Sequence, residues 1–452
     1  MTSAKTKKTA AKDPHALGAR RLSQTVLDDV LEKKRPLDAA LEERLSKAAG
    51  ANMSGRDRAF ARAIATTTLR RMGQIDDIIR RFTKKGKLPS RSRAALAILR
   101  AGVAELVFLD VPPHAALDSA NRLTARHTVA RHFRPLINAV MRQVAENMQG
   151  AVDGQDIYAL NIPKWLRQRW EAAYGATTAQ AIGEACLRPP PLDLSLKSSD
   201  QIDQWQDRLS AQKLANHSLR LKQAGQVEQL PGFEDGAWWA QDAAATLPVM
   251  LFGDAVKGQT VVDLCAAPGG KTAQLAALGA NVVAVDRSAG RLKRVRENLD
   301  RLGLSAAIVE ANVLSWQPSE PAPFVLLDAP CSATGTIRRH PDILRAKSDK
   351  DIESAAEIQT KMLTHAAGFV APGGMLVFCT CSLELEEGPD QVARFLASHS
   401  NFERAPLTAD EVFGQEDFIT AEGDLRTLPC HWDTLGGLDG FYAARLKRAN
   451  GA

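Results

Sequence analysis

The order of predicted elements between Gln259 and Thr380 restricts the fold of this chain more than any other feature. Short apolar runs there alternate with segments whose apolar residues recur every three to four positions. Such an alternation is typical of a parallel, doubly wound α/β sheet, which binds its ligand at the carboxyl ends of the strands. The predicted strands are 260–265, 281–286, 306–310, 324–328 and 375–380.

The helices predicted between these strands have recognisable boundaries. Ser288 can cap a helix whose inward-facing residues continue to Leu302, and Gly303 ends it. A short helix is predicted over 270–279 and a long one over about 348–370. These helices would cover the sheet on both faces.

The first third of the chain has another pattern, helical throughout and strongly basic. Apolar residues recur at helical spacing over 16–149, and no alternating strand pattern interrupts them. The first 150 residues contain 29 Lys and Arg against 14 Asp and Glu, whereas the remainder contains 29 against 38. This asymmetry suggests a polyanion-binding module attached to a catalytic one. A solvated basic face without a ligand is the alternative, and charge alone does not decide between them.

A chain of 452 residues accommodates about three folding units. The lysine-rich segment 1–13 is expected to be a disordered tail. We expect an all-helical domain over 14–150, a small α+β connector over 151–240, and the α/β domain over 241–450.

Composition excludes several classes of protein. No apolar run approaches the roughly 18 residues that a membrane-spanning helix needs, and the N-terminus lacks the apolar stretch of a signal peptide. Six cysteines in a chain of this length do not form a disulfide scaffold, so a cytoplasmic location is expected. Cys379 and Cys381 form a C-x-C pair that cannot enclose a metal, and we expect no metal site.

The string DLCAAPGGKT, from Asp263 to Thr272, lies between a predicted strand and a predicted helix. Small residues allow close approach of a ligand, and a helix N-terminus offers free N–H groups. Asp286 ends the next strand, where a nucleoside-binding fold places an acid against ribose hydroxyls. A P-loop would need glycine at Cys265, and the G-x-G-x-x-G signature is absent. A tight turn without a ligand remains the simplest alternative, but the long string with its acid favours a bound nucleoside.

The same string resembles the first motif of the RNA cytosine-C5 methyltransferases, the Nol1/Nop2/Sun family. The resemblance implies a Rossmann-like catalytic domain that binds S-adenosylmethionine. It places Asp286 on the ribose, Asn312 at the adenine and Asp328 near the cofactor. The other implied cofactor contacts come from Cys265, Ala266, Ala267, Pro268, Gly269, Gly270 and Lys271.

Two further cysteines lie at the ends of predicted strands. Cys331 follows Asp328 by three residues in Asp-Ala-Pro-Cys, and Cys381 lies in Thr-Cys-Ser. A single cysteine is usually a small buried hydrophobe. The family resemblance instead implies that Cys381 adds to C6 of cytosine as the nucleophile, that Cys331 assists release of the methylated RNA, and that Asp328 lies at the cytosine ring. Cys379 has no implied role and is expected to pack.

The match departs from the family pattern at two places. Asn312 stands where the third strand commonly ends in aspartate, which leaves the adenine contact to an amide. Glu386-Glu387-Gly388 lacks the asparagine that commonly follows the acidic pair. The basic segment Arg338–Asp342 after the Pro-Cys loop is expected to hold the RNA backbone, with an ordinary exposed turn as the alternative.

The helical domain resembles the RNA-binding antitermination factor NusB. A NusB-like domain ahead of this catalytic domain is similar to the bacterial 16S ribosomal RNA cytosine-967 C5-methyltransferases, and implies 16S rRNA as the partner. Two alternatives stay open. One is a cytosine-C5 methyltransferase of transfer or other RNA, and the other is a non-catalytic RNA-binding or antitermination factor.

Overall fold

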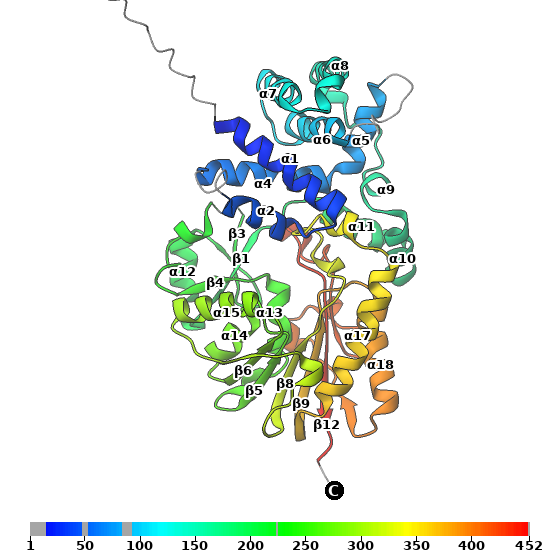
Figure 1. Cartoon of the computed structure of the whole chain (residues 1–452). Helices are drawn as coiled ribbons and strands as arrows, with labels where there is room; N and C mark the ends of the chain where they lie inside the picture. The colour runs from blue at the N-terminus through cyan, green and yellow to red at the C-terminus, as the bar shows by residue number, and fades with distance from the viewer. Residues whose placement is uncertain (1–14, 48–52, 84–92, 223–224, 451–452) are drawn as a thin grey trace, which may run out of the picture. The chain divides into compact units, whose positions relative to one another are not determined.

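The computed structural model describes residues 15–47, 53–83, 93–222 and 225–450 of the chain (Figure 1). The predicted tail 1–13 lies outside these residues. The chain divides into two compact units, one formed by Met1–Pro163 with His340–Ala346 and the other by Lys164–Arg339 with Lys347–Ala452. The segment 151–240, expected to be a separate connector, is therefore shared between the two units.

The first unit is helical, as predicted, and packs around the apolar helix α6. Leu99, Val103 and Leu106 of α6 are fully buried in its core. Arg20 and Glu105 form a buried ion pair of 2.6 Å beside them. The helices of this unit are α1 (His15–Lys33), α2 (Leu37–Ser46), α4 (Gly55–Arg70), α5 (Met72–Arg81), α6 (Arg93–Phe108), α7 (Pro113–Arg126), α8 (Arg134–Glu146), α9 (Ile157–Asn161) and α16 (Ile343–Ala346).

The basic residues of α4 do not all face solvent. Arg70, on the inner side of α4, is only 6% exposed, whereas Arg56, Arg58 and Arg62 of the same helix are accessible to solvent. The helical period places them on different sides. The lysines between 84 and 87 lie outside the described residues.

The second unit contains a small antiparallel sheet within the segment 192–240. Its strand order is β2-β3-β1-β4, and a fully buried ion pair of 2.7 Å joins Asp193 on β1 to Arg220 on β3. The strands are β1 (Leu192–Leu196), β2 (Gln212–Lys213), β3 (Leu219–Leu221) and β4 (Trp238–Ala240), and the neighbouring helices are α10 (Lys164–Tyr174), α11 (Ala176–Cys186) and α12 (Ile202–Leu209).

The main sheet of this unit is mixed. Among the described residues its order is β10-β12-β9-β8-β5-β6-β7, with β11 paired to β12. The pairs among β5–β9 are parallel, as predicted, but β12 runs antiparallel to β9. The strands are β5 (Thr260–Leu264), β6 (Asn281–Asp286), β7 (Ala307–Glu310), β8 (Ala322–Asp328), β9 (Val370–Thr380), β10 (Phe402–Arg404), β11 (Leu425–Thr427) and β12 (Phe441–Arg448).

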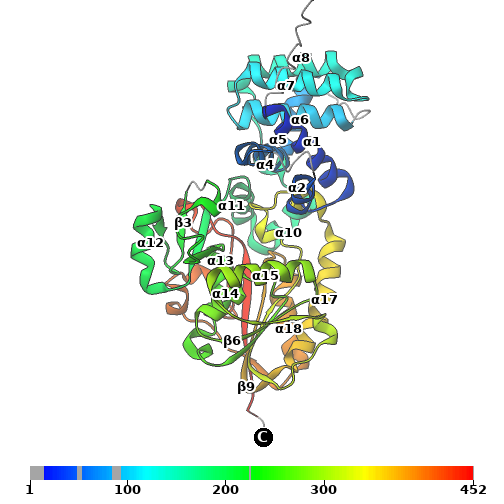
Figure 2. The same ribbon diagram turned by 60° about the vertical axis from the view of Figure 1, so that its left-hand side comes forward.

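Helices cover both faces of this sheet, as Figures 1 and 2 show. Ser288 caps α15 by accepting from Arg291 N, and Gly303 ends it with a φ of 59°, so both predicted boundaries are confirmed. One core contains α13 and α14 residues, and another contains residues of α17 and α18. The helices are α13 (Ala243–Met250), α14 (Gly270–Ala277), α15 (Ala289–Leu302), α17 (Asp349–Ala367) and α18 (Pro389–Ser398). None of the helices in the described part of the chain is long and apolar enough to cross a membrane.

The strand order locates a binding crevice. From β5 the chain proceeds to β6 and β7 on one side, and then returns to β8 on the other side of β5. The loops that leave β5 and β8 therefore diverge at their carboxyl ends, which is where open α/β sheets bind ligands. DLCAAPGGKT leaves β5, and Asp328–Cys331 leaves β8.

Candidate functional site

The loop after β5 is held in a conformation that requires glycine. Gly269 has a φ of 99°, and a Cβ at this position would lie 3.0 Å from Val295 Cγ1. Ala266 and Ala267 are buried in the loop, whereas Pro268 is exposed. Gly270 then begins α14, so the free N–H groups of the first turn lie at the crevice.

Asp286, at the end of β6, holds this loop from the side. Its carboxylate accepts hydrogen bonds from Ala267 N at 3.2 Å and from Ser288 N at 3.0 Å. Arg291 lies 3.7 Å from the same carboxylate and donates to Ala267 O. Asp286 is thus placed at the predicted position, next to the loop that the sequence assigns to the cofactor.

Asn312 follows β7 and lies at the same edge of the sheet. β7 pairs with β6, and Asp286 is opposite Glu310 in the register. Asn312 is exposed, and its side-chain oxygen accepts from Leu314 N at 3.1 Å. The turn therefore uses the amide oxygen, and an adenine amino group would compete with Leu314 for it.

A buried carboxylate beneath the loop has one oxygen without a partner. Thr272 donates to Asp263 Oδ2 at 2.6 Å, but Asp263 Oδ1 has no hydrogen-bond partner among the described residues. Burial raises the pKa of Asp263 to about 7, against the lowering effect of the Thr272 hydrogen bond. S-adenosylmethionine carries an ammonium and ribose hydroxyls, all of them donors, so the loop fits this cofactor.

Lys271 points from α14 to the loop after β8. Its Nζ donates to Asp328 Oδ2 at 2.8 Å and lies 4.8 Å from the ring centroid of Phe441. Burial alone would lower the pKa of the Lys271 ammonium, but Asp328 and the nearby thiols of Cys379 and Cys381 raise it overall. The ammonium therefore stays charged, and the Lys271 side chain binds Asp328, a contact that the sequence did not predict.

Cys331 and Cys381 meet at the ends of β8 and β9. Their sulfurs lie 3.4 Å apart, and both residues are partly buried. The hydrogen bond with Cys381, followed by burial, raises the pKa of the Cys331 thiol well above its ordinary value. The structure therefore brings together two cysteines that lie 50 residues apart in the chain.

Cys379 is buried, as expected of a packing residue, but it also contacts the site. Its Sγ donates to Asp328 Oδ1 at 3.5 Å, and burial raises the pKa of the thiol well above its ordinary value. Lys271 and Cys379 thus hold Asp328 from two sides. The side chain of Asp328 remains 32% exposed, which leaves it accessible to a substrate.

In the segment Arg338–Asp342, which was expected to hold the RNA backbone, internal carboxylates bind the two arginines. Arg338 is 1% exposed and lies 3.1 Å from Asp439 Oδ1, and Arg339 binds Asp242 and Asp439. His340 lies 3.3 Å from Asp38, and Asp342 accepts from Leu37 N at 3.1 Å, both within the first unit. These charges balance internal partners, which a charge pattern in sequence cannot reveal.

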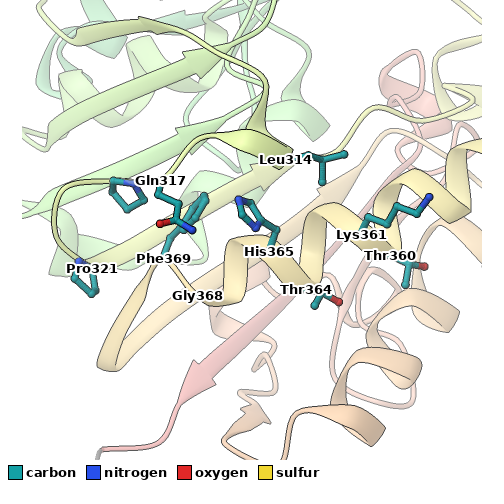
Figure 3. A pocket seen from close by; sticks show the side chains of 10 residues that line it. Leu314, Gln317, Pro321, Thr360, Lys361, Thr364, His365, Gly368 and Phe369 are labelled. Atoms are coloured by element: carbon teal, nitrogen blue, oxygen red, sulfur yellow. The ribbon is translucent and has the colours of Figure 1, made fainter.

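A cavity in the described residues lies away from this site. It has a volume of about 770 Å³ and lies between the segment 314–321 and the end of α17 (Figure 3). Pro321 and Phe369 of its lining precede β8 and β9, so the cavity lies at the amino ends of the strands. His365 there hydrogen-bonds Trp316 O at 3.0 Å and packs edge-on to Phe369. These contacts explain the histidine as structural.

Comparisons with known proteins identify the family of this chain. Residues 250–447 match the family model described as 16S rRNA methyltransferase RsmB/F, and residues 17–146 match the NusB family. The ribosomal RNA small subunit methyltransferase B of Shewanella oneidensis is 32% identical over 96% of this chain and 100% of its own length. The protein of the same name from Yersinia pseudotuberculosis is 34% identical over 94% of this chain and 98% of its own.

Solved structures share the fold. The crystal structure of PH0851 aligns with a TM-score of 0.73 at 22% identity, over 98% of this chain and 100% of that one. NSun6 from Pyrococcus horikoshii, solved with SFG, aligns with a TM-score of 0.53 at 18% identity, over 64% and 99% of the two chains. The resemblance stated from the sequence motifs is confirmed. The chain belongs to the 16S rRNA methyltransferase RsmB/F family, with a NusB-family domain ahead of a Rossmann-like domain that uses S-adenosylmethionine.

Proposed function

We propose that this chain methylates C5 of a cytosine in 16S rRNA, and that Cys381 is the nucleophile that adds to C6. The observation that carries the proposal is the pair of sulfurs, Cys331 and Cys381, 3.4 Å apart beside the Lys271–Asp328 ion pair. The members of the family named above are small-subunit rRNA methyltransferases, which supports this substrate. The resemblance to the 16S rRNA cytosine-967 methyltransferases supports cytosine 967 as the modified nucleotide.

The chemistry needs a thiolate because C5 of cytosine is a weak nucleophile. Addition of the Cys381 sulfur to C6 forms an S–C bond and moves the C5–C6 π electrons toward C5. Asp328 is the group that supports the ring at N3, because it is partly exposed while Lys271 and Cys379 fix its position. The bound cofactor supplies an electrophilic methyl group.

Release requires that a base remove the proton from C5 of the methylated adduct, so that the C5–C6 double bond re-forms and the S–C6 bond breaks, with Cys381 leaving as a thiolate. The pKa of Cys331 is raised, so its thiol is protonated at neutral pH and can donate a hydrogen bond to the departing Cys381 thiolate. This stabilises the leaving sulfur during elimination. Because C5 and C6 must both be reached, the target cytosine has to be unpaired or extruded.

RNA that contains 5-fluorocytosine tests the proposal, because fluorine at C5 blocks the elimination. We expect a covalent protein–RNA complex with the unchanged protein, none with Cys381→Ala, and a persistent complex on unmodified RNA with Cys331→Ala. Gel electrophoresis under denaturing conditions measures all three. Full methylation by Cys381→Ala together with its loss in Cys331→Ala would reverse the two roles.

The same measurement separates the alternatives. A non-catalytic RNA-binding factor would give no covalent complex at all. Bisulfite sequencing of ribosomal and transfer RNA from a strain that lacks the gene identifies the RNA. Loss of one methylcytosine in 16S rRNA is expected, and a loss confined to transfer RNA would replace the proposed substrate.

A further inference from the structure

One buried carboxylate at the site has no part in the chemistry described so far. Glu387 lies at the end of the 3₁₀ turn Leu385–Glu387 and is fully buried. Its Oε1 accepts from Ser332 N at 2.8 Å and from Gln359 Nε2 at 3.1 Å. Its Oε2 accepts from Ser382 Oγ at 2.5 Å and from Ser332 Oγ. Neutral donors thus surround the carboxylate, and hydrogen bonds to a charged acceptor are the strong ones.

The two serines that bind Glu387 directly follow the two reactive cysteines. Ser332 follows Cys331 after β8, and Ser382 follows Cys381 after β9. The two hydroxyls also lie 3.1 Å from each other. Since one peptide unit separates each serine from its cysteine, the position of each serine limits the position of the neighbouring sulfur.

Two other bonds, made by Gln359 and by the backbone of Glu387, also reach the loops that carry the cysteines. Gln359, which donates to Glu387, also donates to Pro330 O at 3.0 Å, on the other side of Cys331. Thr380, just before Cys381, donates to the backbone carbonyl oxygen of Glu387 at 3.1 Å, a bond that does not involve the carboxylate. Glu387 therefore contacts the residues flanking both thiols, and no other carboxylate described above does so.

We propose that Glu387 is a positioning residue that sets the separation of the Cys331 and Cys381 sulfurs. The effect on the spacing of the thiols follows from the hydrogen bonds above, and its consequence for catalysis rests on the proposed function. Without the carboxylate, Ser332 and Ser382 lose their common acceptor, and the two loops can move independently. In this role Glu387 contacts neither RNA nor cofactor, and it acts only through the positions of the two cysteines.

Phenylarsine oxide measures the spacing without any methylation. Its arsenic forms bonds to two thiols and releases water, so tight binding needs both sulfurs close together. We expect the unchanged protein to bind it, and Cys331→Ser to lose about 100-fold in affinity because one of two linked contacts is gone. Glu387→Ala should approach the weakened affinity of Cys331→Ser, while Cys381 still reacts with a monofunctional thiol reagent. Glu386→Gln is the matched control, since this neighbouring carboxylate is 43% exposed and should leave arsenical binding unchanged.

The kinetics of methylation are the second measurement. Glu387→Gln keeps the size of the side chain and one oxygen acceptor, but not the charge that both hydroxyls share. We expect kcat to fall about 10-fold or more with an unchanged KM for RNA, because displaced reacting groups affect the chemical step. A merely structural role would instead change the folded fraction, which circular dichroism and thermal unfolding report.

Arsenical affinity and kcat together distinguish failure of the positioning role of Glu387 from failure of the nucleophile assignment. Arsenical affinity and kcat that are unchanged in folded Glu387→Ala overturn the positioning role, even if the 5-fluorocytosine complex forms as proposed. An absent 5-fluorocytosine complex overturns the nucleophile assignment, while the arsenical reading still decides the spacing. If Glu387→Ala does not fold, Glu387→Gln decides by the same two measurements.

Discussion

At the residue scale, the ion pair between Lys271 and Asp328 explains how a buried ammonium is kept charged at the site. The Lys271 side chain is 9% exposed, and its ammonium lies between Asp328 and the face of Phe441. A buried charge is costly unless it is paired and hydrogen-bonded. Asp328 therefore keeps the Lys271 ammonium charged, and the ion pair connects α14 to the loop after β8.

Asp263, in contrast, has no cation as close to its carboxyl group as Lys271 is to that of Asp328. Its folded-state pKa is raised from 3.8 to about 7, chiefly by burial. Protonated Asp263 therefore contributes stability that is fully present below pH 3.8 and is lost as the pH rises through about 7. The folded protein binds this proton in a range where the unfolded chain has released it.

We predict that Asp263→Asn removes this part of the pH dependence. The amide stays neutral at every pH and can still accept from Thr272. The free energy of unfolding of the unchanged protein should fall between pH 4 and pH 7 more steeply than that of the variant, and urea unfolding at several pH values measures the difference. Parallel curves for the two proteins would show that Asp263 is ionised throughout.

At the element scale, the turn between β5 and α14 depends on backbone shape as much as on side chains. Gly269 reaches a left-handed conformation and lies against Val295 of α15. This contact lets α14 start at the crevice while α15 packs behind it. The turn thus connects the cofactor site to the packing of two helices.

We predict that Gly269→Ala costs about 1–3 kcal/mol of folding free energy, because alanine is strained at positive φ. It should also weaken S-adenosylmethionine binding, as the methyl group displaces Val295 or the loop. Urea unfolding and titration calorimetry measure the two effects. Gly290→Ala is the control: it lies in α15 with open space around its Cβ position, and we expect it to be neutral or slightly stabilising. Equal effects of the two variants would contradict this account of the turn.

At the scale of the whole molecule, distant segments meet on a few buried charges. Arg339, just after the Pro-Cys loop, binds Asp242 before α13 and Asp439 before β12. Asp242 also caps α13 by accepting from Ala244 N at 2.9 Å. The loop that carries Cys331 is thereby connected to both the start of the sheet domain and its last strand. Residues 340–346, which come next, belong to the first unit, so the chain passes between the units directly after this cluster.

We predict that Arg339→Met destabilises the protein by about 3 kcal/mol, because it leaves two buried carboxylates with less compensation. Arg188→Met is the matched control, since the Arg188–Asp433 pair is 45% and 56% exposed and such pairs contribute about 1 kcal/mol or less. Urea unfolding of both variants gives the comparison. A loss for Arg339→Met no larger than for Arg188→Met would show that Arg338 alone compensates Asp242 and Asp439.

Local signals in the sequence were sufficient to predict the order of the helices and strands. They also predicted which edge of the sheet carries the site. Hydrophobic periodicity, the Ser288 cap and the Gly303 stop are properties of neighbouring residues, so they can be read without the fold. The strand-end positions of Asp286, Asp328, Cys331 and Cys381 followed from the same patterns. The family motif then supplied the chemistry.

Only the tertiary structure decided which side chains meet. The antiparallel pairing of β12 with β9, the ion pair of Arg338 with Asp439, the Lys271–Asp328 pair and the contact of Glu387 with Ser332 all join residues far apart in the chain. Local periodicity says which face of an element is apolar, but it carries no information about the partner across a sheet or loop. The function of a charged residue depends on that partner, and so it became visible only in the folded molecule.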